Sequence, residues 1–202
     1  MSIAILPVRD PIAAEPLPVY RFSVKQYHRM IEAGILTDKD RVELLQGWIV
    51  PKMPQTPLHA GTITRITRRF APLLPSEWPL RVQSAITLPE SEPEPDLAIA
   101  RGPEEIYFRR HPGPWDIGLL IEVAGSTLLD DRRRKGEIYA AARIPHYWIV
   151  NLVDRVVEAY TRPRAGKTTG YRTQQVYGIK ESIPLILAGR EVRKIRVSDL
   201  LP

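Results

Sequence analysis

The apolar run at residues 117–123 (IGLLIEV) constrains the fold of this chain more than any other segment. A continuous apolar run of this length is typical of a central β-strand that is covered on both faces. The run carries one charged residue, Glu122, near its end. A buried carboxylate that is left unpaired costs several kcal/mol, so Glu122 requires a cation, a hydrogen-bonding network or a proton.

Predicted strands and helices alternate along the rest of the chain. Helical periodicity and capping residues predict helices over residues 24–33, 58–74 and 126–142. Short apolar runs between turn residues predict strands at 41–45, 48–53, 81–88, 95–100, 117–123, 147–151 and 156–161, then a polar loop at 162–170 and weaker strands near 172–177 and 193–197. This pattern predicts an α/β (α+β) fold, a mixed β-sheet core flanked by helices, with an N-terminal helix and hairpin.

The predicted domain organisation is simple. Residues 1–19 contain four prolines and no apolar period, so we expect an extended, Pro-rich arm there. At about 150 residues per domain, residues 20–202 are expected to form a single domain.

Charge and composition narrow the classes of function. The 29 Lys and Arg residues outnumber 23 Asp and Glu, and the first 100 residues carry 11 of each sign, so the excess of +6 lies in residues 101–202. A basic half favours an anionic partner such as nucleic acid. The chain has no cysteine, which excludes disulfides, thiolate nucleophiles and Cys-ligated metal centres. No apolar run approaches the roughly 20 residues that span a bilayer, so we expect a cytoplasmic protein without a membrane partner.

A second carboxylate, Asp96, opens the predicted strand at 95–100. Two carboxylates that lie together repel each other, and a divalent cation relieves this repulsion. Mg²⁺ prefers one or two carboxylates together with waters and phosphate oxygens. Two plainer interpretations stay open, in which Glu122 forms a structural salt bridge with an arginine and Asp96 belongs to a turn after Pro95.

The predicted helix at 126–142 carries the basic run Arg132, Arg133, Arg134 and Lys135. At about 100° per residue, Lys135 shares a stripe with core-facing positions of the helix. These positions are Leu128, Asp131, Ile138, Tyr139 and Ala142. Arg133 and Arg134 lie on other faces, where they are solvated or contact phosphate, and Arg132 lies at the border. A plainer interpretation pairs Lys135 with Asp131 and directs it to solvent.

Several segments, in order and spacing, resemble the Uma-type (Uma-two) family of putative restriction endonucleases, within the PD-(D/E)XK nuclease superfamily. They are Pro95-Asp96, the segment from Glu122 to Thr127, Asp131 to Lys135, Tyr139-Ala140 and Ile144 to Val150, with Val42-Glu43-Leu44, Gly47 and Pro57-Leu58-His59 upstream. The resemblance covers about residues 20–200 and implies the restriction-endonuclease-like fold.

The resemblance implies roles for individual residues. Asp96 and Glu122 would be the metal-binding acids and Lys135 the catalytic lysine, with Glu43 added to the metal site. His59, which opens a predicted helix, would contact phosphate or cap the helix. The superfamily usually places its lysine two residues after the acid, and that position is Ala124 here. The family's lysine would then come from the following helix.

The sequence therefore predicts an endonuclease that uses Mg²⁺ or Mn²⁺ to hydrolyse phosphodiester bonds in DNA. Arg132, Arg133 and Arg134 would hold the phosphate backbone. Because cutting both strands needs two sites, a homodimer is plausible. Two alternatives stay open: a catalytically inactive nucleic-acid-binding module of the same fold, which Ala124 makes conceivable, and a homodimeric protein-interaction domain.

Overall fold

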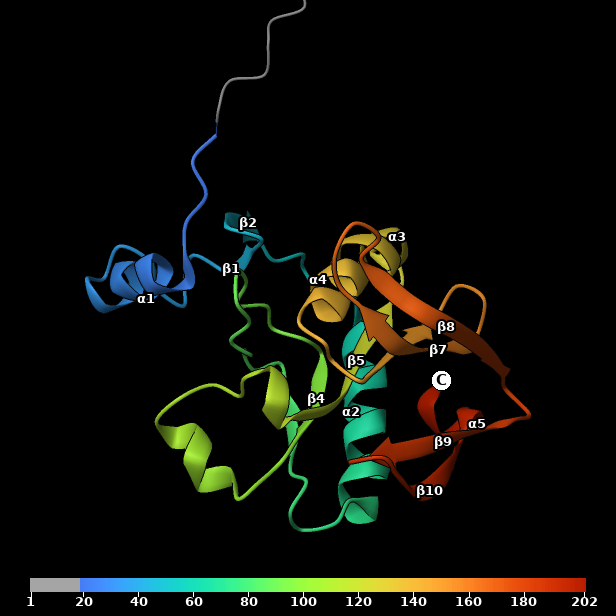
Figure 1. The fold of residues 1–202 in the computed structure, drawn as a ribbon. Coiled ribbons are helices and arrows are strands. Elements are labelled where there is room, and N and C mark those ends of the chain that lie inside the picture. Colours follow the sequence, from blue (N-terminus) through green and yellow to red (C-terminus); the bar gives the residue numbers. More distant parts are fainter. Residues whose placement is uncertain (1–18) are drawn as a thin grey trace, which may run out of the picture.

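A six-stranded mixed sheet forms the centre of the protein, whose computed structural model describes residues 19–202 (Figure 1). Its order is β3 (Leu80–Val82), β4 (Leu97–Ala100), β5 (Ile117–Ala124), β6 (His146–Asn151), β7 (Val156–Arg164) and β8 (Gly170–Gly178). β5 and β6 are parallel and all other neighbours are antiparallel. The predicted mixed sheet is confirmed, whereas the predicted arm at 1–19 lies, but for its last residue, outside the described residues.

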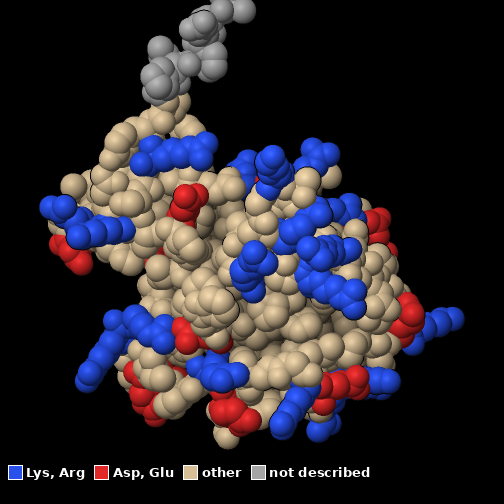
Figure 2. Space-filling view, viewed as in Figure 1, with Lys and Arg blue, Asp and Glu red and all other residues tan. Residues whose placement is uncertain are grey.

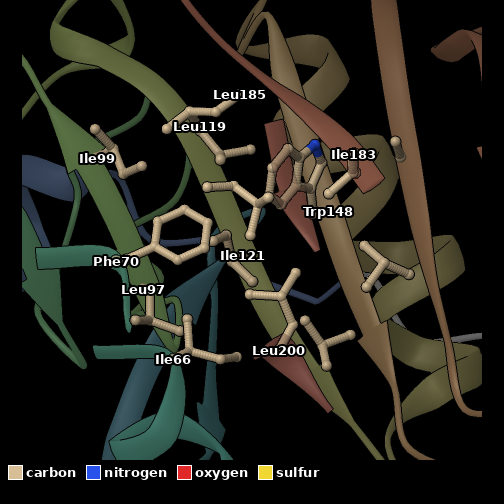
Figure 3. Close-up of a cluster of buried hydrophobic side chains, with 14 of the residues drawn as sticks. Ile66, Phe70, Leu97, Ile99, Leu119, Ile121, Trp148, Ile183, Leu185 and Leu200 are labelled. Atoms are coloured by element: carbon tan, nitrogen blue, oxygen red, sulfur yellow. The ribbon is translucent and has the colours of Figure 1, made fainter. Parts of the chain in front are cut away.

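The central strand β5 is buried along its whole length. Alternate residues contribute to two apolar clusters, one on each face of the sheet. Leu119, Ile121 and Val123 pack into the first cluster, part of which Figure 3 shows around Phe70 and Trp148. On the other face the second cluster contains Leu120 and Ala124, and Glu122 lies between them in the alternation of the strand.

Helices cover both faces of this sheet. They are α2 (Pro57–Phe70), α3 (Leu128–Asp130), a π-helical turn (Asp131–Lys135), α4 (Gly136–Ala141) and α5 (Val197–Leu200). A further helix, α1 (Val24–Glu32), lies apart from the sheet, where the hydroxyl of Tyr27 donates to the carbonyl of Val42 (Figure 1). α2 supplies Ile63, Ile66 and Phe70 to the first cluster, and α4 supplies Ile138 and Tyr139 to the second. Among residues 19–202, no helix combines the length and the apolar character needed to cross a membrane.

Two antiparallel hairpins lie outside the central sheet. The hairpin predicted around Gln46 and Gly47 is formed by β1 (Val42–Leu45) and β2 (Trp48–Pro51), and its second strand ends two residues before the predicted limit. Both turn residues have positive φ angles. β9 (Ser182–Leu187) and β10 (Arg190–Arg196) form the second hairpin. The main-chain N–H of Phe22 donates to the carbonyl of Gly47, so the hairpin and the start of α1 are joined.

Four expectations from the sequence need correction. The strand predicted at 81–88 ends at Val82, because Gln83 has a φ of 47°. The loop predicted at 162–170 is shorter, since pairing continues to Arg164 and Gly170. β9 was not predicted; it contains Pro184, which a strand with a single partner accommodates. The helix predicted at 126–142 is interrupted by the π-helical turn.

Candidate active site

Asp96 and Glu122 lie side by side because β4 and β5 are antiparallel neighbours in which Leu97 pairs with Ile121. The main-chain N–H of Val123 donates to Oδ2 of Asp96 at 2.8 Å. The N–H of Asp96 donates in turn to Oε2 of Glu122 at 3.3 Å. Both carboxylates are buried, so the sheet itself holds the two predicted metal-binding acids next to each other.

The helix after β5 brings a lysine and a tyrosine to Glu122. The Nζ of Lys135 donates to Oε1 of Glu122 at 2.9 Å, and the hydroxyl of Tyr139 donates to the same oxygen at 2.7 Å. Lys135 therefore points toward the sheet, as its position on the stripe predicted. Its partner is Glu122 across the fold, whereas the carboxylate of Asp131, four residues earlier on the helix, accepts a hydrogen bond from Thr127.

His59 and Glu43 approach the pair from two other elements. Thr56 caps α2 by accepting from the N–H of His59, and the Nε2 of His59 lies 2.9 Å from Oδ1 of Asp96. Glu43 is buried on β1, where its Oε2 accepts from the N–H of Glu94 at 3.0 Å. The imidazole thus contacts an acid directly, while Glu43 lies at the edge of the same cleft.

A cleft of about 830 Å³ joins these residues. Its lining includes four buried carboxylates, those of Glu43, Asp96, Glu122 and Asp131. More exposed basic side chains also line it, namely Arg41, Lys52 and Arg134. The rim also carries Asp38, Glu94 and Asp130, and two of these acids pair with basic neighbours, Glu94 with Lys52 and Asp130 with Arg134. The cleft therefore has an acidic floor below a rim of mixed charge, and the floor suits a divalent cation.

The electrostatics of the floor reflect an excess of negative charge. Burial raises the pKa of Glu122 to about 8, since the opposing effect of Lys135 is partly cancelled by Asp96 and Asp131. Burial likewise raises the pKa of Asp131 to about 6. Burial disfavours the charged form of Lys135, but the carboxylates of Glu122, Glu43 and Asp131 outweigh it and raise the lysine pKa. One ammonium group is thus shared among several carboxylates.

These residues fit a hard divalent cation. Within the described part of the chain, no three His, Asp or Glu side chains already form a metal-binding group. Asp96 and Glu122 would hold the ion together with a main-chain carbonyl near Val123 and waters, a ligand set that Mg²⁺ accepts. Since the raised pKa of Glu122 arises from burial and from neighbouring carboxylates, added positive charge would relieve the repulsion.

The three arginines of the basic run have different surroundings. Arg132 donates through Nε and Nη2 to the buried carboxylate of Glu158, with the shortest distance 2.6 Å. Its guanidinium therefore has a carboxylate partner within the protein, although about 34% of the side chain is exposed, and its contact with phosphate stays a prediction. Arg134 lines the cleft and pairs with Asp130 at 3.2 Å, and Arg133 is exposed.

Sequence reasoning assigned no role to two groups of this region. Tyr139 lies four residues after Lys135, on the same core-facing stripe of the predicted helix. This spacing indicates that the two side chains are neighbours, and both donate to Glu122. Glu158 had no such signal, because its partner Arg132 is 26 residues away in the sequence.

The chain was compared with protein families, with curated proteins and with solved structures. The family model of Uma2, "Putative restriction endonuclease", matches residues 24–197. Among solved structures, the fold is similar to that of a putative nuclease belonging to DUF820 from Anabaena variabilis ATCC 29413. The two share 13% identity and a TM-score of 0.56 over 85% of this chain and 96% of the other. No functionally curated protein matches the chain. The resemblance predicted from the sequence is confirmed, and the chain belongs to the Uma2 family of putative restriction endonucleases.

Proposed function

We propose that this protein is a Mg²⁺- or Mn²⁺-dependent endonuclease that hydrolyses phosphodiester bonds in DNA. The observation that carries the proposal is the meeting of Asp96, Glu122 and Lys135 in one cleft, from two adjacent strands and the following helix. Membership of a family described as putative restriction endonucleases supports the same class of chemistry.

Each residue of the cleft has a task that follows from its contacts. Asp96 and Glu122 would hold the ion through their carboxylate oxygens, and the N–H of Val123 fixes the orientation of Asp96. Tyr139 fixes Glu122 in the same way. A bound divalent cation supplies charge that polarises a phosphate and lowers the pKa of a water molecule. Lys135 holds a proton at Nζ, from which it orients that water or stabilises charge developing on the phosphate.

The position of Lys135 favours an enzyme over an inactive binding module. Ala124 occupies the position on β5 where the superfamily usually has its lysine. The π-helical turn ends at Lys135, and the Nζ of this residue donates to Glu122. Glu122 is also the acid beside which the superfamily's usual lysine would lie on the strand. The ammonium group is therefore supplied from the helix.

Cleavage of supercoiled plasmid tests the proposal. Wild-type protein should nick or linearise DNA with Mg²⁺ or Mn²⁺ and not with EDTA, whereas Asp96→Asn and Lys135→Met should lose this activity. Glu105→Gln, at an exposed acid that does not line the cleft, is the matched control and should cleave like the wild type. Protein purified identically controls for a contaminating nuclease.

A second readout does not depend on turnover. Mg²⁺ at ten times its Kd should stabilise the wild type by about 1.4 kcal/mol and leave Asp96→Asn unchanged, measured by thermal unfolding. Metal-independent cleavage, or equal Mg²⁺ stabilisation of both proteins, would contradict the assignment of Asp96. Salt-dependent DNA binding without cleavage under any of these conditions would instead identify an inactive binding module.

A further inference from the structure

The hairpin formed by β7 and β8 is basic, and its one acid, the buried Glu158, lies near the start of β7, where it pairs with Arg132. Residues 159–180 contain five basic side chains and no Asp or Glu. These side chains are Arg162, Arg164, Lys167, Arg172 and Lys180, all exposed. Figure 2 shows Lys and Arg side chains gathered over the part of the surface where Figure 1 places α3, α4 and this hairpin.

The five basic side chains of this segment do not form ion pairs with described residues of the protein. By contrast, Arg110, Arg132, Arg134 and Arg196 all have carboxylate partners. Arg164 makes one internal hydrogen bond, from Nε to the carbonyl of Thr168. An unpaired cluster of cations raises the local potential and attracts a polyanion.

The hairpin is held firmly beside the helix that carries Lys135. Near the cleft, Glu158 of β7 binds Arg132 of the π-helical turn. Near the hairpin tip, the ring of Tyr171 stacks on Tyr147, and its hydroxyl donates to the carbonyl of Ile144, just beyond the end of α4. The basic side chains thus have a fixed position relative to the cleft, at the far end of this helix.

The separation between hairpin tip and cleft limits the size of the partner. Glu158 lies in one row with Glu122 across β6, and from Glu158 the strand β7 continues to Arg164, six residues further on, which is roughly 20 Å at about 3.3 Å per residue. A mononucleotide is too short to reach both places. Duplex DNA carries one charge per about 1.7 Å of its axis, so a single duplex can place one phosphate in the cleft and others against the hairpin.

Taking the proposed function as given, we propose that the β7–β8 hairpin is a second contact for duplex DNA, which holds the phosphate backbone away from the cleft. Its contacts with phosphates are independent of sequence and contribute to affinity through release of counterions. Arg133, exposed on the intervening helix, lies between the two contact regions along the chain.

Salt dependence of DNA binding measures this contact directly. The test variant replaces Arg164, Lys167 and Arg172 with Gln, and binding of a fluorescent 30-base-pair duplex is titrated in EDTA between 50 and 200 mM salt. The matched control replaces Arg190, Arg193 and Lys194 with Gln. These three are also exposed basic residues on a hairpin, without ion pairs among the described residues, but acidic residues lie near them in the sequence.

Removal of three cations that bind phosphates should lower the slope of log Kd against log salt by about 2 to 3, while the control lowers it by less than about 1. Arg164→Lys with Arg172→Lys preserves the charge and should keep the wild-type slope, which separates loss of charge from damage to the hairpin. Circular dichroism checks that all variants fold.

Equal slopes for the test and control variants would overturn the hairpin contact and leave the nuclease intact, provided that the wild type still cleaves plasmid. Absence of salt-dependent DNA binding by the wild type would overturn both the hairpin contact and the DNA substrate. A slope that changes with duplex RNA only would overturn the assignment of DNA as the partner.

Discussion

Two buried glutamates on one face of the sheet bind the same kinds of side chain, a cation and a tyrosine, but their pKa values are shifted in opposite directions. Glu122 on β5 pairs in register with Ile149 of β6, and Ile149 pairs with Glu158 of β7, so the two carboxylates lie in one row, two strands apart. Each receives a cation from the π-helical turn, Lys135 or Arg132, and each accepts from a tyrosine hydroxyl.

The pKa values of the two glutamates move in opposite directions. Burial raises the pKa of Glu122 to about 8. Burial also acts to raise the pKa of Glu158, but hydrogen bonds from Arg132, Tyr160 and Asn151 outweigh it and lower the value. The planar guanidinium binds both oxygens of Glu158, whereas the ammonium of Lys135 is a single point of charge.

The neighbours of the two glutamates explain the difference. Glu122 lies against Asp96 and near Asp131, and these acids share the charge of Lys135. No carboxylate is among the main groups that raise the pKa of Glu158, and the second acid beside Arg132, Asp154, is exposed. Under the proposed function, the ion pair of Arg132 would serve stability and that of Lys135 chemistry, and the number of buried carboxylates around the cation would separate the two roles.

The largest expected effect concerns cleavage. Glu122→Gln removes a charged metal ligand at nearly constant shape and should reduce metal-dependent plasmid cleavage by at least about 10³-fold, the order attributed to key electrostatic groups in active sites. Glu158→Gln, two strands away, should keep cleavage within about tenfold of wild type. If Glu158→Gln were as inactive as Glu122→Gln, the row would act as one functional unit and the comparison would fail.

The same two variants should show the reverse order in stability. Glu158→Gln leaves the guanidinium of Arg132 without its buried counter-charge and should lower the free energy of unfolding by about 2 kcal/mol. Glu122→Gln relieves repulsion among the acids of the floor, so the free energy of unfolding should change by less than about 1 kcal/mol. Urea denaturation in EDTA measures both, and a larger loss in Glu122→Gln would show that Glu122 is mainly structural.

Much of the fold could be predicted because the patterns that define it are local. The apolar run of β5 predicted a strand covered on both faces, and Ser23 with Gln26 predicted the start of α1, where the structure has a capping box. The end of β3 and the limits of the β7–β8 loop were predicted wrongly. The end of β3 depends on its pairing with β4, in which Val82 meets Leu97, 15 residues later. The β7–β8 loop is short because pairing between these consecutive strands continues through polar residues to Arg164 and Gly170, which no apolar pattern marks.

The assembly of the site was predictable to a similar extent. Asp96, Glu122 and Lys135 each stood out by position, and the structure brings all three together. Arg132 could not be separated from its neighbours, because its role depends on Glu158 of β7. A helical wheel assumes 100° per residue, and the π-helical turn at Asp131–Lys135 departs from this value in the segment that decides which basic side chain points inward.

Acidification offers a smaller test of the same contrast. Because the folded-state pKa of Glu158 is lowered, its contribution to stability is present above the unfolded pKa of about 4.5 and is lost as pH falls through the folded value. Stability measured between pH 6 and 3 should therefore fall less steeply in Glu158→Gln than in the wild type. Equal acid dependence of wild type and Glu158→Gln would contradict the lowered pKa.

The effect of Glu122 on the pH dependence of stability should be the reverse. Because the folded-state pKa of Glu122 is raised, the free energy of unfolding of the metal-free protein should decrease as pH rises from about 4.5 to 8.

The smallest effects are expected from the two tyrosines, which make equivalent hydrogen bonds of 2.7 Å. Tyr139→Phe and Tyr160→Phe each remove one hydroxyl and should each cost about 1 kcal/mol of unfolding free energy. Glu158 keeps its bonds to Arg132 and Asn151 in Tyr160→Phe, so cleavage should be unchanged. Glu122 loses one of the two side-chain donors that orient it in Tyr139→Phe, so plasmid cleavage should slow by about tenfold and Mg²⁺ should stabilise the variant less than the wild type. Identical cleavage rates for the two variants would show that Tyr139 only packs against the sheet.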